Sequence, residues 1–338
     1  MVNVRWIQYE LFMFVLGLQG SPRIKGNTGI LLSTFLAEAE SLGAYTKHLD
    51  VARMSITPCQ ECGTCEKEGF CPIDDDMQQI YPLLRNADLI VMATPIFFYG
   101  ATAQMKALID RSQVLWARRY IHRLIDPGSN QRHGFLLSLG ATKGENLFDG
   151  VSLTAKYFFD AVGAHFKGSL TYRQVEGPGE IRQHPTALTD AREKARDLVT
   201  PFLNRKKILF VCIGNTCRSQ MASAFARYHA GDRIEVESAG SCPEQEVNPV
   251  MVEVMEEKGF DLAFCRPKSI EQGICHGKPD LIITMGCGDT CSFISGVKNQ
   301  EWSVPDPAGK PVEIMRKIRD EIEERVGRLV SAYGFRVC

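Results

Sequence analysis

The chain has 338 residues, enough for two domains of ordinary size, and 44% of them are hydrophobic. Its 39 basic and 40 acidic side chains leave a formal net charge of −1, so neither a nucleic-acid partner nor an anionic membrane surface is predicted. The longest early apolar run, residues 11–18, is too short to cross a bilayer, and twelve cysteines without a secretion signal predict redox or metal chemistry in a reducing cytoplasm.

Segments with strand and helix patterns alternate in both halves of the chain, which predicts an α/β protein. We expect two doubly wound domains with parallel sheets, at residues 1–203 and 204–338. The boundary is placed between a charged helix predicted at residues 189–198 and the basic pair Lys206-Lys207.

The first predicted strand, residues 14–18, runs into a glycine-rich turn and then a helix that reaches about residue 39. The turn reads Gly20-Ser-Pro-Arg-Ile-Lys-Gly-Asn-Thr28. A short turn of this kind, with hydroxyl, arginine and backbone N–H groups between a strand and a helix, is a phosphate cradle. It has neither the dinucleotide fingerprint nor the Walker lysine arrangement.

Residues 59–71 hold four closely spaced cysteines, Cys59, Cys62, Cys65 and Cys71. Four such thiols can ligate a 4Fe–4S cluster. Zinc is one alternative, because four cysteines also satisfy its tetrahedral preference, and a role as free thiols is another. A pair of structural disulfides is disfavoured in a chain without a secretion signal.

Two further strands are predicted at residues 89–93 and 135–139. They open into the loops Thr94-Pro-Ile-Phe-Phe-Tyr-Gly100 and Gly140-Ala-Thr-Lys-Gly144. Each loop alone is compatible with an ordinary tight turn. Together with the first turn they predict the crevice at the carboxyl ends of a doubly wound sheet, where residues 95–99 can border a flat ring.

These motifs, with Asp75-Asp-Met77, make residues 13–195 resemble the iron–sulfur flavoproteins of the NADPH-dependent FMN reductase family. The resemblance implies FMN, with the phosphate on Ser21, Arg23, Asn27 and Thr28, the ring against Pro95, Ile96, Phe97, Phe98 and Tyr99, and Gly140 in the third loop. It also implies NAD(P)H or a small electron carrier as donor. A homodimer or homotetramer is expected, in which the cluster passes electrons to a neighbouring flavin.

In the second half, a strand predicted at residues 207–211 runs into Cys212-Ile-Gly-Asn-Thr-Cys-Arg-Ser219, and helical spacing continues from Met221. Arg218 offers two donors to an oxyanion, and the same positive field favours the thiolate of Cys212. The other interpretation of Cys212 is a buried cysteine that simply ends a strand. The expected anion nest consists of the backbone N–H groups of Gly214, Asn215, Thr216 and Cys217.

A buried strand at residues 281–285 precedes Gly286-Cys-Gly-Asp-Thr-Cys291, and Asp306-Pro-Ala-Gly-Lys-Pro311 follows. With Ser238-Ala-Gly240 and Arg266-Pro-Lys-Ser269, these motifs make residues 205–332 resemble the thioredoxin-coupled arsenate reductases, which have the low-molecular-weight tyrosine phosphatase fold. The resemblance implies that Cys212 is the nucleophile, Arg218 the oxyanion clamp, Asp306 the general acid and Ser219 the hydrogen-bond partner of the thiolate.

Arsenate reduction needs further thiols, because releasing arsenite requires two electrons. By the resemblance, Cys287 attacks the thiol–arsenate adduct to give a Cys212–Cys287 disulfide, and Cys291 then carries the oxidation to a Cys287–Cys291 pair. Only three residues separate these two cysteines, fewer than in the best-studied branch of the family. A helix-start cysteine near the surface is therefore the alternative interpretation of Cys291.

The sequence therefore predicts a flavodoxin-like domain fused to a low-molecular-weight phosphatase-like domain. We expect a bifunctional redox protein in which FMN and NAD(P)H chemistry supplies electrons for arsenate reduction, with thioredoxin or a ferredoxin-like protein as a further candidate donor. One alternative is a tyrosine phosphatase fused to an independent FMN reductase. In others, the first domain acts on a separate target such as a quinone or an organoarsenical, or one domain is a sensor or assembly module.

Overall fold

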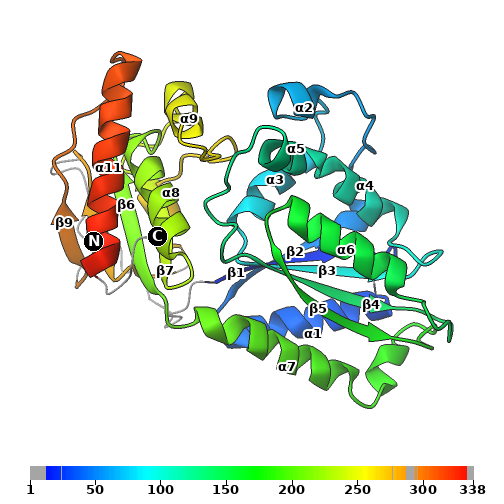
Figure 1. The fold of residues 1–338 in the computed structure, drawn as a ribbon. Helices are drawn as coiled ribbons and strands as arrows, with labels where there is room; N and C mark the ends of the chain where they lie inside the picture. The colour runs from blue at the N-terminus through cyan, green and yellow to red at the C-terminus, as the bar shows by residue number, and fades with distance from the viewer. Residues whose placement is uncertain (1–12, 24, 276, 287–293, 295, 333–338) are drawn as a thin grey trace.

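The computed structural model describes residues 13–23, 25–275, 277–286, 294 and 296–332. Within them the chain forms two sheets, each built from parallel strands with helices on both faces (Figure 1). The predicted α/β class, with a flavodoxin-like sheet followed by a low-molecular-weight phosphatase-like sheet, is confirmed. The boundary proposed between residues 203 and 204 falls in the short connection between the sheets and stays a prediction.

The first sheet has the strand order β2-β1-β3-β4-β5. The predicted strands 14–18, 89–93 and 135–139 lie within β1, β3 and β4. Since β1 lies between β2 and β3, the strand order reverses at β1, and this switch point is where doubly wound sheets bind ligands. The strands are β1 Phe14–Gln19, β2 Tyr45–Asp50, β3 Leu89–Pro95, β4 His133–Leu139 and β5 His165–Tyr172.

Helices cover both faces of this sheet, α1 and α7 on one and α3 to α6 on the other (Figure 1). Successive strand residues point to opposite faces, so Val15 packs with α1 and α7 whereas Leu16 packs against the other layer. The helices are α1 Asn27–Ser41, α2 Thr64–Glu68, α3 Met77–Asn86, α4 Ala103–Arg111, α5 Gln113–Tyr120, α6 Asp149–Ala161 and α7 Ala187–Val199, with 3-10 turns η1 Val51–Arg53, η2 Glu180–Gln183 and η3 Thr200–Phe202.

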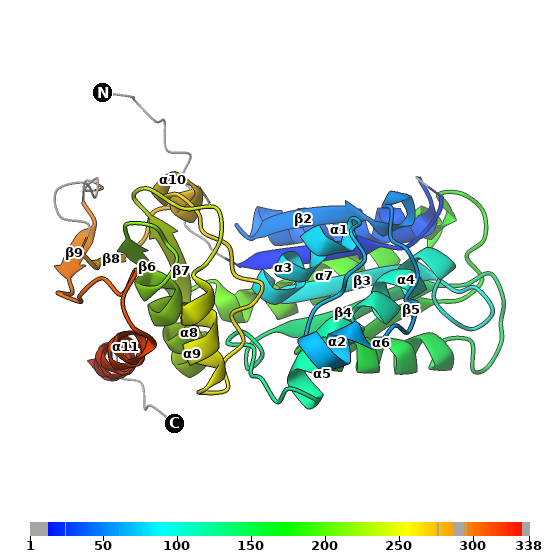
Figure 2. The same cartoon turned by 90° about the horizontal axis from the view of Figure 1, so that it is seen from above.

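The second sheet has the order β7-β6-β8-β9, with α8, α9 and α11 on one face and the short α10 on the other (Figures 1 and 2). Its elements are β6 Lys206–Cys212, α8 Arg218–Ala230, β7 Ile234–Gly240, α9 Pro249–Glu256, α10 Ile270–Ile274, β8 Leu281–Thr284, β9 Lys298–Glu301 and α11 Val312–Ala332. In the described parts of both halves, every helix is too short or too polar to span a bilayer.

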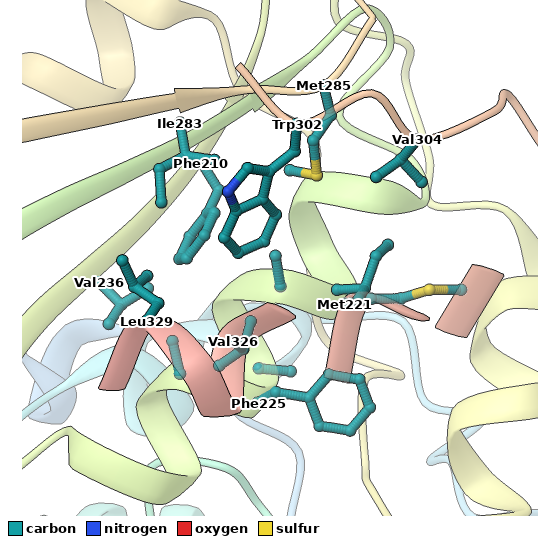
Figure 3. Close-up of a cluster of buried hydrophobic side chains, with 14 of the residues drawn as sticks. Phe210, Met221, Phe225, Val236, Ile283, Met285, Trp302, Val304, Val326 and Leu329 are labelled. Atoms are coloured by element: carbon teal, nitrogen blue, oxygen red, sulfur yellow. The ribbon is translucent and has the colours of Figure 1, made fainter. Parts of the chain in front are cut away.

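The core of the second half fixes the elements around β6. Trp302 is 4% exposed and lies beside Phe210 of β6, with ring centroids 5.7 Å apart (Figure 3). Phe225 of α8 and Val326 of α11 pack in the same cluster. The connection from β6 to α8 therefore starts and ends on two elements held by the same core.

The two halves meet at the amino end of the first sheet. Asp88, directly before β3, accepts hydrogen bonds from Arg205, directly before β6, at 3.0 and 3.1 Å. Arg227, near the end of α8, donates to the carbonyl of Asn86 at 3.0 Å. Burial opposes the charge of Asp88, but the adjacent Arg205 guanidinium holds its pKa below the usual value.

A buried ionic cluster forms the centre of this interface. The side chain of Asp261 is 1% exposed and accepts hydrogen bonds from Arg85 of α3 and, at 2.8 Å, from Nε of Arg118 in α5. Arg118 also pairs with Glu256 of α9 at 2.5 Å and donates to the carbonyl of Gly69, directly after α2, at 3.1 Å. One arginine thus connects the segment after α2 with the second half.

Candidate active site and cofactor cavity

Cys212 lies at the carboxyl end of β6 and is 2% exposed. Its Sγ is 3.0 Å from Oγ of Ser219, the second residue of α8. The same hydroxyl accepts a hydrogen bond from Nδ2 of Asn215 at 2.8 Å. With Asn215 as its donor, the Ser219 hydroxyl still has its own proton to donate, and a donor at this position stabilises a Cys212 thiolate.

Asn215 fixes the loop between β6 and α8. Its φ of 54° lies in the left-handed region, which asparagine tolerates better than most residues. Its Oδ1 accepts hydrogen bonds from the Lys268 N–H at 2.9 Å and from Gln220 Nε2 at 3.2 Å. The loop conformation is thus held by residues from α8 and from the segment before α10.

Two glycines allow neighbouring segments of the chain to lie directly against this loop and against Arg218. A Cβ on Gly240, the last residue of β7, would lie 2.5 Å from the carbonyl oxygen of Ile213. Gly286 has a φ of 70°, and a Cβ there would lie 2.7 Å from Nη1 of Arg218. Both glycines belong to motifs quoted from the sequence, but that reasoning did not identify Gly286 as a site residue.

Arg218 is 4% exposed and points across the site to the segment after β9. Its Nη1 donates to the carbonyl of Val304 at 3.2 Å, and its Nη2 donates to Oδ2 of Asp306 at 2.6 Å. The Asp306 side chain is 49% exposed, so it lies at the mouth of the site. An oxyanion that binds Arg218 competes with Asp306 for the guanidinium, and this competition releases the carboxyl group toward the ligand.

Cys217 is the second thiol of the loop and has a different environment. Burial first, and then the charges of Cys212 and Asp306, raise the pKa of Cys217 to about 11. Near neutral pH it is therefore a protonated thiol and a poor nucleophile. The same interactions place Cys217 close to Cys212, Arg218 and Asp306, so these predicted residues share one site.

Of the predicted residues in this half, the structure brings together Cys212, Gly214, Asn215, Thr216, Cys217, Arg218, Ser219 and Asp306 in or beside one loop. Cys287 and Cys291 lie outside the described residues. The chain that leads to them passes the site, because the Met285 N–H donates to the Val211 carbonyl at 2.7 Å and Gly286 lies against Arg218.

In the first half, the three predicted loops meet around a cavity of about 160 Å³. Eight of the ten residues predicted for FMN line it, namely Ser21, Arg23, Asn27, Thr28, Pro95, Ile96, Phe97 and Gly140, whereas Phe98 and Tyr99 do not. Val175 and Glu176, which follow β5, also line it and were missed. They could have been found only from their position directly after β5, and the sequence analysis did not predict that strand.

The side chain of Asn27 holds the cavity wall together. Its Nδ2 donates to the carbonyl of Gly177 at 2.8 Å, and its Oδ1 accepts from the Ile181 N–H at 3.2 Å. Because both side-chain atoms of Asn27 are used in this way, its predicted contact with the phosphate can come only from its backbone N–H, at the start of α1. Gly26, the residue before α1, has no side chain to cap the helix, so the N–H groups of the first turn face the cavity as an anion site.

The residues present fit the phosphate end of FMN, with the ring lying outside the cavity. A volume of about 160 Å³ is below the roughly 300–1,000 Å³ of pockets that enclose whole small molecules. Phe97 and Gly100 exchange two backbone hydrogen bonds of 3.0 Å, which closes a two-residue turn. Phe98 at its tip is fully exposed, and Tyr99 is half exposed, so both lie where a ring outside the cavity would pass.

The four cysteines of residues 59–71 line a second, open cavity of about 820 Å³. All four are free thiols, and among the described residues no three Cys, His, Asp or Glu side chains, these four included, lie close enough together to hold a metal ion. Burial raises the pKa of Cys65, while a hydrogen bond with Thr64 lowers that of Cys62. Four thiols on one cavity are the donor set that either a cluster or zinc requires.

The FMN cavity and the Cys212 loop face away from each other. The cavity lies at the carboxyl ends of β1, β3 and β4, whereas the interface between the halves lies at their amino ends. The seven residues of β3 span about 20 Å. On the other side, α8 runs from Arg218 to the interface over 13 residues, again about 20 Å. Within one chain the two sites are therefore far from contact.

Comparison with known proteins divides the chain in the same way. Residues 207–334 match the low molecular weight phosphotyrosine protein phosphatase family, and residues 13–136 match the NADPH-dependent FMN reductase family. Arsenate reductase 2 of Staphylococcus epidermidis is 38% identical over 128 residues, which are 37% of this chain and 95% of that protein. A solved arsenate reductase from Archaeoglobus fulgidus is 32% identical and covers 37% of this chain and 98% of its own, with a TM-score of 0.34.

The first half is similar to iron–sulfur flavoproteins. One from Methanocaldococcus jannaschii is 40% identical over 103 residues, which are 30% of this chain and 53% of that protein. The chain thus spans about half the length of the iron–sulfur flavoproteins that it matches. Arsenate reductase-like and FMN reductase-like domains are both present.

Proposed function

Because this chain belongs, through residues 207–334, to the family of low-molecular-weight phosphotyrosine protein phosphatases and arsenate reductases, we propose that its Cys212 site reduces arsenate to arsenite. The observation that carries the proposal is the 3.0 Å contact between Cys212 Sγ and the Ser219 hydroxyl, beside an arginine held 2.6 Å from Asp306. Attack on an oxyanion requires a nucleophile, a cation that binds two oxygens and an acid. Cys212 beside its hydroxyl partner, Arg218 and Asp306 are groups of these three kinds.

In the first step, the Cys212 thiolate attacks arsenic and a hydroxide leaves as water, taking its proton from Asp306. Arg218 holds two of the remaining oxygens and balances their charge. Binding of the oxyanion draws Arg218 away from Asp306, which leaves the carboxyl group free to turn toward the oxygen that leaves. Binding of the oxyanion therefore moves both Arg218 and Asp306 into position for the reaction.

In the second step, the thiolate of Cys287 attacks Cys212 Sγ of the adduct. The sulfur–arsenic bond breaks, its electron pair stays on arsenic as arsenite leaves, and a Cys212–Cys287 disulfide forms. Cys291 then attacks this disulfide, which restores Cys212 and leaves a Cys287–Cys291 disulfide for an external reductant. Arsenic gains two electrons and the two thiols lose two. The assignment of both cysteines is carried over from the family resemblance.

We propose FMN as the cofactor of the first domain, with its phosphate on Ser21, Arg23, Thr28 and the first-turn N–H groups of α1. When bound, FMN supplies a two-electron acceptor for a hydride donor such as NAD(P)H. The Asn27 side chain then acts as a positioning group, because its two hydrogen bonds hold the wall formed by residues 176–181. Pro95, Ile96 and Phe97, with the turn at Phe98 and Tyr99, border the ring.

We also propose that Cys59, Cys62, Cys65 and Cys71 hold a 4Fe–4S cluster, with zinc as the alternative. The support is the set of four free thiols on one cavity and the similarity to iron–sulfur flavoproteins. Metal and sulfide analysis of anaerobically purified protein separates the two. Iron and sulfide near four per chain support the cluster, whereas stoichiometric zinc without sulfide contradicts it.

We further propose that electrons pass from the flavin of the first domain to the thiols of the second. The two sites face away from each other within one chain, so we propose that the transfer occurs between chains of a homodimer or homotetramer, or through a mobile carrier such as thioredoxin. The alternative function, a tyrosine phosphatase fused to an independent FMN reductase, uses the same Cys212, Arg218 and Asp306 but no second thiol.

Arsenite formation by reduced protein tests the proposed function. Cys212→Ser should abolish it, because an alcohol gives no accessible anion near neutral pH. Arg218→Lys should reduce it severely, since an ammonium group cannot reproduce the planar grip on two oxygens. Exposed Cys275→Ser is the matched control and should leave the rate unchanged. Substantial arsenite production by Cys212→Ser would remove this loop from the mechanism.

A further inference from the structure

A third cavity, of about 780 Å³, lies on the α1 face of the first sheet beside the edge strand β2. Its wall is formed by Gln19 at the end of β1, His48 and Asp50 of β2, the α1 segment 29–38, and Arg182 and Arg192 from η2 and α7. It shares no lining residue with the FMN cavity, although Lys25 and Gly26 are neighbours in one turn. Neither function proposed above uses it.

Gln19 is the unusual group in this wall. The residue is 3% exposed, and its buried Oε1 accepts no hydrogen bond from any described residue. Buried polar groups are nearly always hydrogen-bonded, so one without a donor calls for an explanation. Gln19 lies on the same face of β1 as Val15, which packs toward α1, and it therefore points to the cavity. A ligand with an N–H group would supply the missing donor.

The cavity also carries excess positive charge. The side chains of Lys25, Arg182 and Arg192 line it, and the described residues give none of these three side chains an ion pair or hydrogen-bond partner. The two acidic residues of the wall are already neutralised from outside it: Glu38 pairs with Arg196 at 2.7 Å and Asp50 with Arg53 at 3.2 Å. The charged groups left for a ligand are therefore the three cations, which favours an anion such as phosphate.

The segment that carries Arg182 is held in place without a ligand. The N–H groups of Glu176 and Gly177 both donate to the Glu180 carboxylate at 2.7 Å, and Asn27 binds the Gly177 carbonyl at 2.8 Å. The Arg182 N–H in turn donates to the Gly179 carbonyl at 3.0 Å. A backbone fixed in this way lowers the entropy lost when a ligand binds.

We infer that this cavity binds a nucleotide, with its phosphate on Lys25, Arg182 and Arg192 and an N–H group of its base on Gln19. The volume is in the range of small-molecule sites. Inorganic phosphate would satisfy the cations but would leave the buried amide oxygen without a donor. A nucleotide carries the anion and the N–H donor in one molecule, so it answers both observations.

Equilibrium binding to the full-length protein saturated with FMN tests the inference, using ADP and methyl phosphate as probes. ADP should bind saturably without displacing FMN. The double variant Arg182→Gln/Arg192→Gln should weaken both probes by about tenfold or more, since each charged hydrogen bond is worth roughly that factor. Lys194→Gln removes a charge from α7 outside the cavity and should change neither affinity.

Gln19→Met separates the base from the phosphate. This variant removes the acceptor at similar volume, so the unliganded protein should melt at the same temperature or higher, which shows that it folds. ADP should then bind about tenfold more weakly while methyl phosphate, whose dianion has neither an N–H nor an O–H donor, binds as before. Equal effects on the two probes, absence of saturable ADP binding, or displacement of FMN by ADP would each overturn the inference. All these readouts are independent of arsenate or flavin turnover.

Discussion

Ser219 links the fold of the second half to its chemistry. Its hydroxyl accepts a hydrogen bond from Asn215, whose backbone lies in the left-handed region, and its Oγ lies 3.0 Å from Sγ of Cys212. The neighbouring Cys217 accepts a hydrogen bond from the Thr216 hydroxyl at 3.7 Å, but its burial raises its pKa. The two thiols of the loop therefore have different hydroxyl partners, and burial is the main cause of the raised pKa of Cys217.

The second thiol distinguishes a reductase from a phosphatase. We predict that Cys287→Ser loses arsenite formation and retains hydrolysis of an aryl phosphate, because displacement at phosphorus needs only the nucleophile, the clamp and the acid. Both activities are measured on the same preparation, with Cys242→Ser, an exposed cysteine, as the control. Arsenite production at the parent rate would show that the proposed disulfide relay is wrong.

The turn after β8 controls the clamp through Gly286. We predict that Gly286→Ala raises the KM for arsenate by about tenfold or more, because the added Cβ would lie 2.7 Å from Nη1 of Arg218 and displace it from two-oxygen binding. The measurement is steady-state kinetics with an external reductant.

Gly63→Ala is the control for backbone strain. Gly63 has a φ of 73°, close to the 70° of Gly286, and a Cβ there meets nothing within 4 Å. Each substitution should lower stability by about 1–2 kcal/mol, the cost of a left-handed residue with a side chain. An unchanged KM in Gly286→Ala would mean that Arg218 is not held where the structure has it.

Strands with a clear hydrophobic pattern were predictable from the sequence. A strand that is defined only by its hydrogen bonds to a neighbouring strand was not. Strands β1, β3, β4 and β6 are buried apolar runs, and because parallel strands end at one edge, their loops were expected to meet. Strand β9 reads Lys-Asn-Gln-Glu and is exposed throughout, so no hydrophobic period marks it. It is identified only by its parallel pairing with β8.

The site shows the same division. The residues around Cys212 come from motifs and were expected, whereas the use of the Asn27 side chain was not. Its partners, Gly177 and Ile181, are about 150 residues away in the chain, and only the folded sheet brings them to α1. Arg85 and Arg118 likewise had no visible partner in the sequence, because Asp261 belongs to the other half of the chain.

The buried ionic cluster makes the two halves one unit. We predict that Asp261→Asn lowers the free energy of unfolding by about 3 kcal/mol, the lower end for breaking a buried ion pair, because Arg85 keeps Asp126 and Arg118 keeps Glu256 as partners. Denaturant unfolding measures it. Asp320→Asn is the control, since Asp320 is 53% exposed and its ion pairs should be worth less than about 1 kcal/mol. Equal losses would mean that the cluster does not hold the interface.

The arrangement of the whole molecule also bears on electron transfer. With the FMN cavity and the Cys212 loop at opposite ends, we predict that reoxidation of prereduced flavin by protein disulfide becomes faster as protein concentration rises. Stopped-flow mixing under anaerobic conditions over a wide concentration range measures this. A tightly associated oligomer would instead give a constant rate that is lost on dissociation. A constant rate in a monomeric preparation would contradict the separation of the two sites.

The central claim, that the Cys212 site is an arsenate reductase, is tested most directly by a single turnover without added reductant. Fully reduced protein is mixed anaerobically with excess arsenate, and arsenite and free thiols are counted together. We expect about one arsenite per chain and the loss of two thiols for each arsenite formed, as the two-electron balance requires. Arsenite without thiol loss, or release of phosphate from aryl phosphates with no arsenite at all, would contradict it.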